Sequence, residues 1–161
     1  LYQNPVKELD AMRKNRVEYN HVVIKDNTIS LAQIEGRTID LECVVRPEDK
    51  KNVYKKFALR FAQNEKFYTA LSYRPYESIL KMDRKFSGSK RAVVHQRRCQ
   101  VNKESNELKL RVILDRFSAE VFINDGEQVM SAVIYTEQEA KGISFIADGA
   151  VEIDVVKYDL V

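Results

Sequence analysis

Residues Glu107–Glu127 read ELKLRVILDRFSAEVFINDGE, and this stretch decides the fold. Its first part alternates: Leu108, Leu110, Val112 and Leu114 are apolar, and most of the residues between them are polar. A period of two places successive side chains on opposite faces of a β-strand, so the pattern predicts a strand with one buried face. A second alternating run ends on Asn-Asp-Gly, whose residues tolerate the positive φ angles of a tight hairpin turn. The stretch therefore predicts consecutive antiparallel strands.

The rest of the chain continues in short runs of the same kind. Further strands are predicted where apolar or alternating runs lie between turn residues, at 17–24, 28–32, 38–46, 56–62, 66–73, 78–83, 93–101, 128–135, 142–147 and 151–160. About ten to twelve short strands at regular spacing are typical of two packed antiparallel sheets. We therefore predict an all-β fold, a two-sheet antiparallel β-sandwich of the jelly-roll or concanavalin-like kind, with a short N-terminal helix.

That helix is predicted over residues 5–16. Asn4 suits its N-cap, and the proline that follows suits its first position. Val6, Leu9 and Met12 recur at a spacing of three, so they form a narrow apolar stripe. Such a stripe must pack on another surface, which is either the rest of this domain or a separate one.

Composition fits one ordinary domain of 161 residues with 44% hydrophobic residues. The formal net charge is +3, and the basic residues are spread along the chain, which argues against nucleic-acid binding. No apolar run approaches the ~20 residues that cross a bilayer, so no membrane partner is expected. The first four residues hold neither an initiator Met nor a signal-peptide pattern, which indicates a fragment and leaves the compartment open.

The residues that usually carry chemistry form no constellation in this sequence. Cys43 and Cys99 are too few for a disulfide framework or a metal site. Cys43 shares a face with apolar strand residues, which predicts a buried reduced thiol; a Cys43–Cys99 bridge is the alternative. His21 and His95 lack metal-ligand spacing, and neither a nucleophile elbow nor a Gly-rich phosphate loop occurs. We therefore expect no catalytic residue, no metal and no cofactor.

The amino-acid sequence of the hairpin region also resembles that of a known family. Leu-Asp-Arg-x-Ser-x-Glu-Val-Phe-Ile-Asn-Asp-Gly-Glu, at 114–127, resembles the signature of the C-terminal β-sandwich domain of glycoside hydrolase family 32. This family holds the β-fructosidases: invertases, sucrose-6-phosphate hydrolases, levanases and inulinases. Weaker similarities follow in the family's order, at 3–9, 82–88, 97–99, 142–151 and 158–160.

The resemblance implies a domain that does not carry the catalytic groups of the family. In this family the catalytic groups lie in a separate five-bladed propeller, within Asn-Asp-Pro-Asn-Gly, Arg-Asp-Pro and Glu-Cys motifs. The first two motifs are absent here, and Glu42-Cys43 lies in an alternating run that predicts a strand. The resemblance therefore implies a connector and helix over 1–16, a single sandwich over 17–161, and no propeller. This chain alone is then no enzyme, and it stabilises the propeller of a parent glycosidase that hydrolyses sucrose or fructans.

Two other roles stay open beside this one. An autonomous fructan-binding module would use aromatic faces and polar groups, and one cluster offers both kinds of side chain: Tyr68, Tyr73, Arg74 and Tyr76. An oligomerisation domain would use a sandwich edge or the helix stripe to form a homo-oligomer. In the leading interpretation the partner is the propeller, and the connector supplies the residues that face it: Pro5, Val6, Leu9 and Met12.

Two Asp-Arg dipeptides, Asp83-Arg84 and Asp115-Arg116, lie at predicted strand ends. An arginine fork can bind carboxylates and turn carbonyls together, which favours a structural role in fixing the strand ends. A sugar-binding Asp/Arg pair is the alternative.

Overall fold

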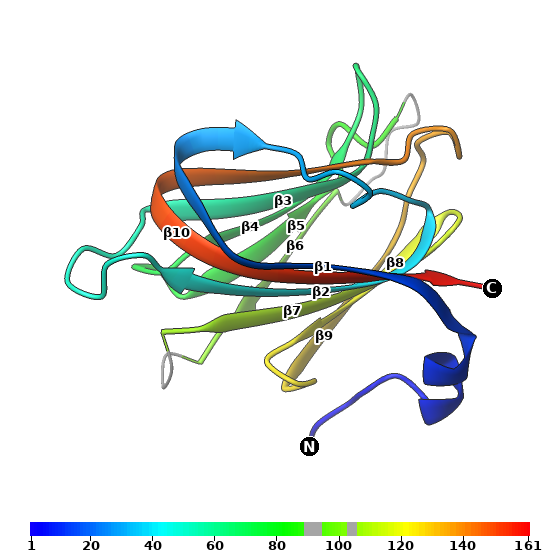
Figure 1. Ribbon diagram of the computed structural model, residues 1–161, viewed down its shortest axis with the longest axis horizontal. Helices are drawn as coiled ribbons and strands as arrows, with labels where there is room; N and C mark the ends of the chain where they lie inside the picture. Colours follow the sequence, from blue (N-terminus) through cyan, green and yellow to red (C-terminus); the bar gives the residue numbers. More distant parts are fainter. Residues whose placement is uncertain (89–94, 103–105) are drawn as a thin grey trace.

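The computed structural model describes residues 1–88, 95–102 and 106–161 (Figure 1). Over these residues the chain forms one short 3-10 helix and ten strands. Their bounds are η1 Lys7–Met12, β1 Arg13–Ile29, β2 Thr38–Pro47, β3 Lys56–Gln63, β4 Thr69–Arg74, β5 Ile79–Asp83, β6 Gln96–Gln100, β7 Leu108–Asp115, β8 Ser118–Ile123, β9 Gln128–Val133 and β10 Gly142–Leu160. Neighbouring strands pair antiparallel, and the predicted all-β sandwich is confirmed.

Hydrogen bonding follows the order β6-β5-β4-β3-β10-β2-β7-β8-β9, and β1 pairs with the other side of β10. Strand β10 pairs with β3 through Gly142–Asp148 and with β2 through Val151–Asp159. It therefore belongs to two layers, the β3 sheet (β3 to β6) and the β2 sheet (β2 and β7 to β9). Figure 1 shows β1 and β10 curving together from one layer to the other.

The bend in this ribbon has a local cause. The register of β1 shifts between Lys25 and Asn27, and the residue between them, Asp26, has a positive φ of 44°. Its Oδ1 accepts a hydrogen bond from the Gly149 backbone N–H at 2.7 Å. Gly149 has a φ of 97°, and a Cβ there would lie 2.8 Å from the Cα of Tyr54. Glycine is therefore needed where the ribbon changes layer.

The core lies between the two sheets, where the alternating side chains meet. The four apolar residues that open the deciding stretch are each at most 3% exposed: Leu108, Leu110, Val112 and Leu114. Their register partners on β2 are equally buried: Val45, Cys43, Leu41 and Ile39. A one-residue slip of either strand would turn its own buried set to solvent, so the alternation fixes the register. Cys43 is a buried free thiol as predicted, and Cys99 is also free, so the alternative bridge is absent.

The predicted hairpin turn joins β8 to β9. Asn124, Asp125 and Gly126 have φ angles of 50°, 61° and 91°, as the turn chemistry requires. A shorter turn through Arg116 and Phe117 joins β7 to β8, where Asp115 pairs with Ser118. The deciding stretch is therefore three consecutive antiparallel strands.

The predicted helix is wrong in extent. Only Lys7–Met12 is helical, as a 3-10 helix, and strand β1 begins at Arg13. Asn4 does not cap it, because Val6 occupies the N-cap position and no side chain caps the helix. The register explains the early end, since Arg13 pairs with Leu160 and finds its backbone partners on β10. A strand thus displaces the last turn of the expected helix.

Other boundaries moved as well. The strands predicted at 17–24 and 28–32 fall on one strand, β1, which ends at Ile29, and the turn residue Asp26 lies at its bulge. The strand predicted at 93–101 is β6, Gln96–Gln100, and residues 93 and 94 lie outside the described residues. No helix within the described ranges is long and apolar enough to cross a membrane.

Candidate functional site

The N-terminal segment, residues 1–12, lies against the β8–β9 turn. The Gln3 N–H donates to the Gly126 carbonyl at 2.9 Å. A Cβ at Gly126 would stand 2.0 Å from the Gln3 carbonyl oxygen, so the glycine of the turn leaves room for this segment. Further along, the Val161 N–H donates to the Met12 carbonyl at 3.2 Å. The segment is therefore held to the sandwich by its backbone at both ends.

Some apolar side chains of this segment are exposed. Val6 is 69% exposed and Met12 is 41% exposed, while Pro5 and Leu9 are half-buried. No residue of η1 is buried. Packing on its own domain therefore does not cover the stripe that the sequence predicts. Exposed apolar side chains thus lie on a segment whose backbone is held at both ends.

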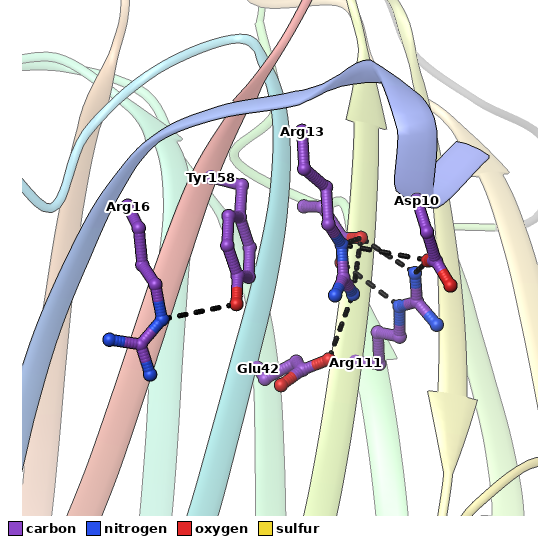
Figure 2. A network of polar contacts seen from close by, with 7 residues as sticks. Asp10, Arg13, Arg16, Glu42, Arg111 and Tyr158 are labelled. Atoms are coloured by element: carbon purple, nitrogen blue, oxygen red, sulfur yellow. Dashed lines mark hydrogen bonds and ion pairs between the residues drawn. The ribbon is translucent and has the colours of Figure 1, made fainter.

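A network of ion pairs anchors the end of this segment to the outer face of the β2 sheet (Figure 2). Asp40 of β2 is fully buried and accepts hydrogen bonds from two arginines. Arg111 of β7 donates from Nε at 3.0 Å and from Nη2 at 2.6 Å, and Arg13 donates from Nε at 2.8 Å. Asp10 of η1 contacts Arg111 at 3.2 Å, and Glu42 accepts from Arg13 at 2.9 Å. The network thus joins η1, β1, β2 and β7.

Both arginines of this network contact carboxylates. Burial alone would lower the pKa of Arg13, but its hydrogen bonds to Asp40 and Glu42 and their charges raise it. Its guanidinium also lies 4.4 Å from the centre of the Tyr158 ring, whose hydroxyl accepts from Arg16 at 3.2 Å. The predicted strand residue Glu42 is therefore part of an ion pair. The arrangement ties the N-terminal segment to strands β2 and β7.

A second ion-pair cluster lies further along the same ribbon. Arg46 donates to Asp154 at 2.8 Å and to Glu152 at 3.2 Å, and His21 contacts Glu152. The hydrogen bonds from Arg46 lower the pKa values of Glu152 and Asp154. Nowhere among the described residues do three or more His, Cys, Asp or Glu side chains gather so that they could hold a metal.

The structure separates the four residues of the expected sugar-binding cluster. Tyr73 is 7% exposed and belongs to the core, whereas Tyr76 is 68% exposed and donates its hydroxyl hydrogen to the Val53 carbonyl at 3.2 Å. Tyr68 precedes the other end of β4 and lies under the Arg60 guanidinium, 4.0 Å from the ring centre. Arg74 is exposed on the outer face of the β3 sheet, away from the core side where Tyr73 points.

Tyr73 and Tyr76 nevertheless share a cleft of about 160 Å³. Its lining comes from four separate segments of the chain: Pro47, Val53, Tyr54, Tyr73, Pro75, Tyr76 and Asn106. Tyr54 is a member that the sequence did not indicate, because it lies in a loop with no periodic pattern around it. Burial raises its pKa, so its hydroxyl stays protonated.

The Asp-Arg dipeptides and an unpredicted arginine fix the strand ends. Arg84 donates to the Val133 carbonyl at 3.0 Å, which ties β5 to β9 as the structural interpretation expects. At the second dipeptide the Arg116 carbonyl accepts from Arg37 Nε at 3.0 Å. Arg37 is 5% exposed and also donates to the carbonyls of Thr136, Glu137 and Ala140. Burial lowers its pKa.

Comparison with known proteins gives one consistent result. The family model described as "Glycosyl hydrolases family 32 C terminal" matches residues 8–160. Sucrose-6-phosphate hydrolase of Staphylococcus xylosus is 31% identical over an alignment of 161 positions, which covers 99% of this chain and 32% of that protein. Levanase of Bacillus subtilis is 26% identical over 95% of this chain and 23% of its own length. The chain thus spans about a third or less of these relatives.

Solved structures share the fold. The sucrose-6-phosphate hydrolase from Lactobacillus gasseri matches with a TM-score of 0.80 at 21% identity, over 99% of this chain and 31% of that chain. The fructan 1-exohydrolase IIa from Cichorium intybus matches with a TM-score of 0.80 at 15% identity, over 99% of this chain and 38% of that chain.

Proposed function

The chain belongs to the glycosyl hydrolase family 32 C-terminal family, and we propose that it serves as the structural partner of a catalytic propeller in a longer β-fructosidase. This family is the C-terminal domain of these enzymes and not their catalytic module. The names of the relatives, sucrose-6-phosphate hydrolase and levanase, support a parent that hydrolyses sucrose-type sugars or fructans.

One observation carries this proposal: the N-terminal segment has a fixed backbone and uncovered apolar side chains. Exposed apolar surface forgoes about 25 cal/mol for each Å² that a partner would cover. Of the four residues predicted to face the propeller, Val6 and Met12 are the most exposed, so they gain most from a docked propeller. We propose that residues 1–12 are the connector and that the sandwich begins at Arg13, four residues before the expected boundary, because β1 begins there.

The test uses the chain and the catalytic propeller of the same enzyme as separate polypeptides. We expect a complex in analytical ultracentrifugation and a higher melting temperature of the propeller in that complex. The double substitution Val6→Ser and Met12→Ser should weaken the complex. Val23→Ser is the matched control, because Val23 is 48% exposed on β1 outside the connector. Release of fructose from sucrose, inulin or levan by the 161-residue chain alone would contradict the proposal.

Fructan binding is a second candidate, favoured by the cleft that Tyr54, Tyr73 and Tyr76 line. Aromatic faces stack on sugar C–H groups, and Tyr76 is the exposed ring among the three. Calorimetry against levan and inulin should then show saturable binding that Tyr76→Ala abolishes and Tyr68→Ala retains. Loss of binding in both variants, or none in the unaltered chain, would exclude this role. Light scattering on the same samples tests the third role, oligomerisation.

A further inference from the structure

The outer face of the β3 sheet carries a row of cations that plays no part in the docking proposal. Ser72 of β4 pairs with Lys81 of β5, which pairs with Arg98 of β6. Register partners in antiparallel strands point to the same face, so these three side chains lie side by side. Their neighbours along the strands, such as Leu80 and Met82, point into the core.

These residues surround a recess in the sheet face. Its volume is about 70 Å³, and its lining is Ser72, Arg74, Glu77, Ile79, Lys81 and Arg98. A water molecule occupies about 30 Å³ in the liquid, so the recess has room for roughly two waters or one tetrahedral oxyanion. Ser72 is 8% exposed and forms the floor, and the three cations form the wall.

Within the described part of the chain, the cations on this face are not paired with carboxylates, unlike the arginines on the β2 sheet. There, Arg13, Arg46 and Arg111 each contact a carboxylate within 3.2 Å. On the β3 sheet, by contrast, no ion pair forms between the described residues for Arg74, Lys81 or Arg98. Arg98 instead contacts the side-chain oxygen of Gln96 at 3.4 Å.

The pKa of the neighbouring Lys56 responds to the positive charges of this cluster. Burial lowers its pKa first, and the charges of Arg74, Lys81 and Arg60 lower it further, while Asp148 acts in the opposite direction. An anion placed among like positive charges relieves their mutual repulsion. Glu77 on the rim is the one carboxylate in the lining, and it opposes an incoming anion.

We propose that this recess binds a tetrahedral phosphoryl dianion, either free phosphate or the phosphate group of a sugar phosphate. The planar forks of Arg74 and Arg98 can each donate two parallel N–H groups to phosphate oxygens. Lys81 supplies a compact charge, and the Ser72 hydroxyl supplies a further donor from the floor. The site is independent of the docking surface, since it lies on the other sheet.

The experiment titrates the 161-residue chain with inorganic phosphate, fructose 6-phosphate and fructose at constant ionic strength, followed by calorimetry and by amide NMR. Constant ionic strength separates binding from general screening. We expect saturable binding of both phosphates, none of fructose, and shifts at the amides of Ser72, Lys81 and Arg98. The double variant Arg74→Gln and Lys81→Gln should bind about tenfold or more weakly, because it loses two charge-assisted contacts.

Arg97→Gln is the matched control. Arg97 follows Gln96 on the same strand and is exposed like Arg98, but it pairs with the core residue Met82 and so points to the opposite face. The Arg97→Gln variant should bind phosphate as the unaltered chain does. Lys81→Gln alone serves if the double variant does not fold. Tighter binding of fructose 6-phosphate assigns a sugar phosphate, and equal binding assigns free phosphate. Absence of saturable binding, or equal losses in Arg97→Gln and the double variant, would overturn the proposal.

Discussion

Arg111 donates two hydrogen bonds to the Asp40 carboxylate, from Nε at 3.0 Å and from Nη2 at 2.6 Å. The two residues are 71 positions apart and lie diagonally across neighbouring strands, because Arg111 pairs with Glu42 and Asp40 pairs with Ile113. Asp40 has no exposed surface, and a buried carboxylate is costly unless it is paired and hydrogen-bonded. The fold is therefore stable only when β2 and β7 pair in the register that brings Arg111 to Asp40.

Removing one partner of this pair should destabilise the domain strongly. We expect Arg111→Met to lower the free energy of unfolding by about 3 kcal/mol, because Asp40 keeps Arg13 but loses its bidentate partner. Urea unfolding followed by circular dichroism measures this loss. The control is Lys109→Met on the same strand, which breaks the exposed pair with Asp125 and should cost about 1 kcal/mol or less. Equal losses in the two variants would show that Asp40 does not depend on Arg111.

The Arg46 cluster predicts how stability changes in acid. Its hydrogen bonds lower the folded-state pKa values of Glu152 and Asp154 below their unfolded values of about 4. Their stabilisation is then present above the unfolded pKa and disappears as the pH falls through the folded pKa. Arg46→Gln should remove this contribution, so its melting temperature should fall less than that of the unaltered chain between pH 6 and the acid range.

Thermal melts from neutral to acid pH make this comparison. Lys66→Gln in the β3–β4 loop is the control, because Lys66 is exposed and forms no ion pair within the described residues. Its melting temperature should follow the unaltered chain at each pH. A parallel curve for Arg46→Gln would mean that these carboxylates do not contribute to the pH dependence.

The sequence predicted the architecture because the architecture depends on a local pattern. Period-two alternation decides which side chains face inward, so the buried pairs between β2 and β7 follow from residues 38–46 and 107–115 alone. The helix prediction failed for the opposite reason. Its signals were local, whereas Arg13 is drawn into a strand by Leu160, at the other end of the chain.

The polar sites could not be predicted from the sequence, because their partners are also distant along the chain. Asp40 meets Arg13 and Arg111 only once the register is known, and Arg37 finds four carbonyls that are 79 to 103 positions away. Tyr73 is the instructive case, because its alternation with Leu71 already places it with the core residues of β4. The clustering of tyrosines in sequence had suggested one shared rim.

The two thiols should differ from ordinary cysteines in reactivity. Burial raises the pKa of Cys43 to about 12 and that of Cys99 to about 11. Because the thiolate is the nucleophile, both should react slowly with iodoacetamide at pH 8, and Cys43 should be the slower because it is fully buried. Mass spectrometry of timed samples measures the rates, and the chain in urea should label quickly at both positions. Rapid labelling of Cys43 in the native protein would contradict its placement in the core.

Gly126 links the turn of the deciding stretch to the proposed docking segment. Its φ of 91° disfavours any side chain, and a Cβ would stand 2.0 Å from the Gln3 carbonyl oxygen. Because the contact is with backbone, Gly126→Ala should displace residues 1–5 and break the hydrogen bond from Gln3. Backbone strain of this kind costs about 1–3 kcal/mol. Amide hydrogen exchange of Gln3, followed by NMR, should therefore become much faster.

Gly36→Ala separates this local effect from general destabilisation. Gly36 also has a positive φ, of 141°, but a Cβ there would stand 2.5 Å from a side-chain methyl group of Ile39 and not from backbone of the connector. Both variants should melt at a lower temperature, because both place a side chain in a left-handed conformation. Exchange at Gln3 should rise in Gly126→Ala alone, since the atoms nearest to a Cβ at Gly36 all belong to Ile39. If exchange at Gln3 were unchanged in Gly126→Ala, the turn would not hold the segment, and the fixed backbone on which the docking proposal rests would be lost.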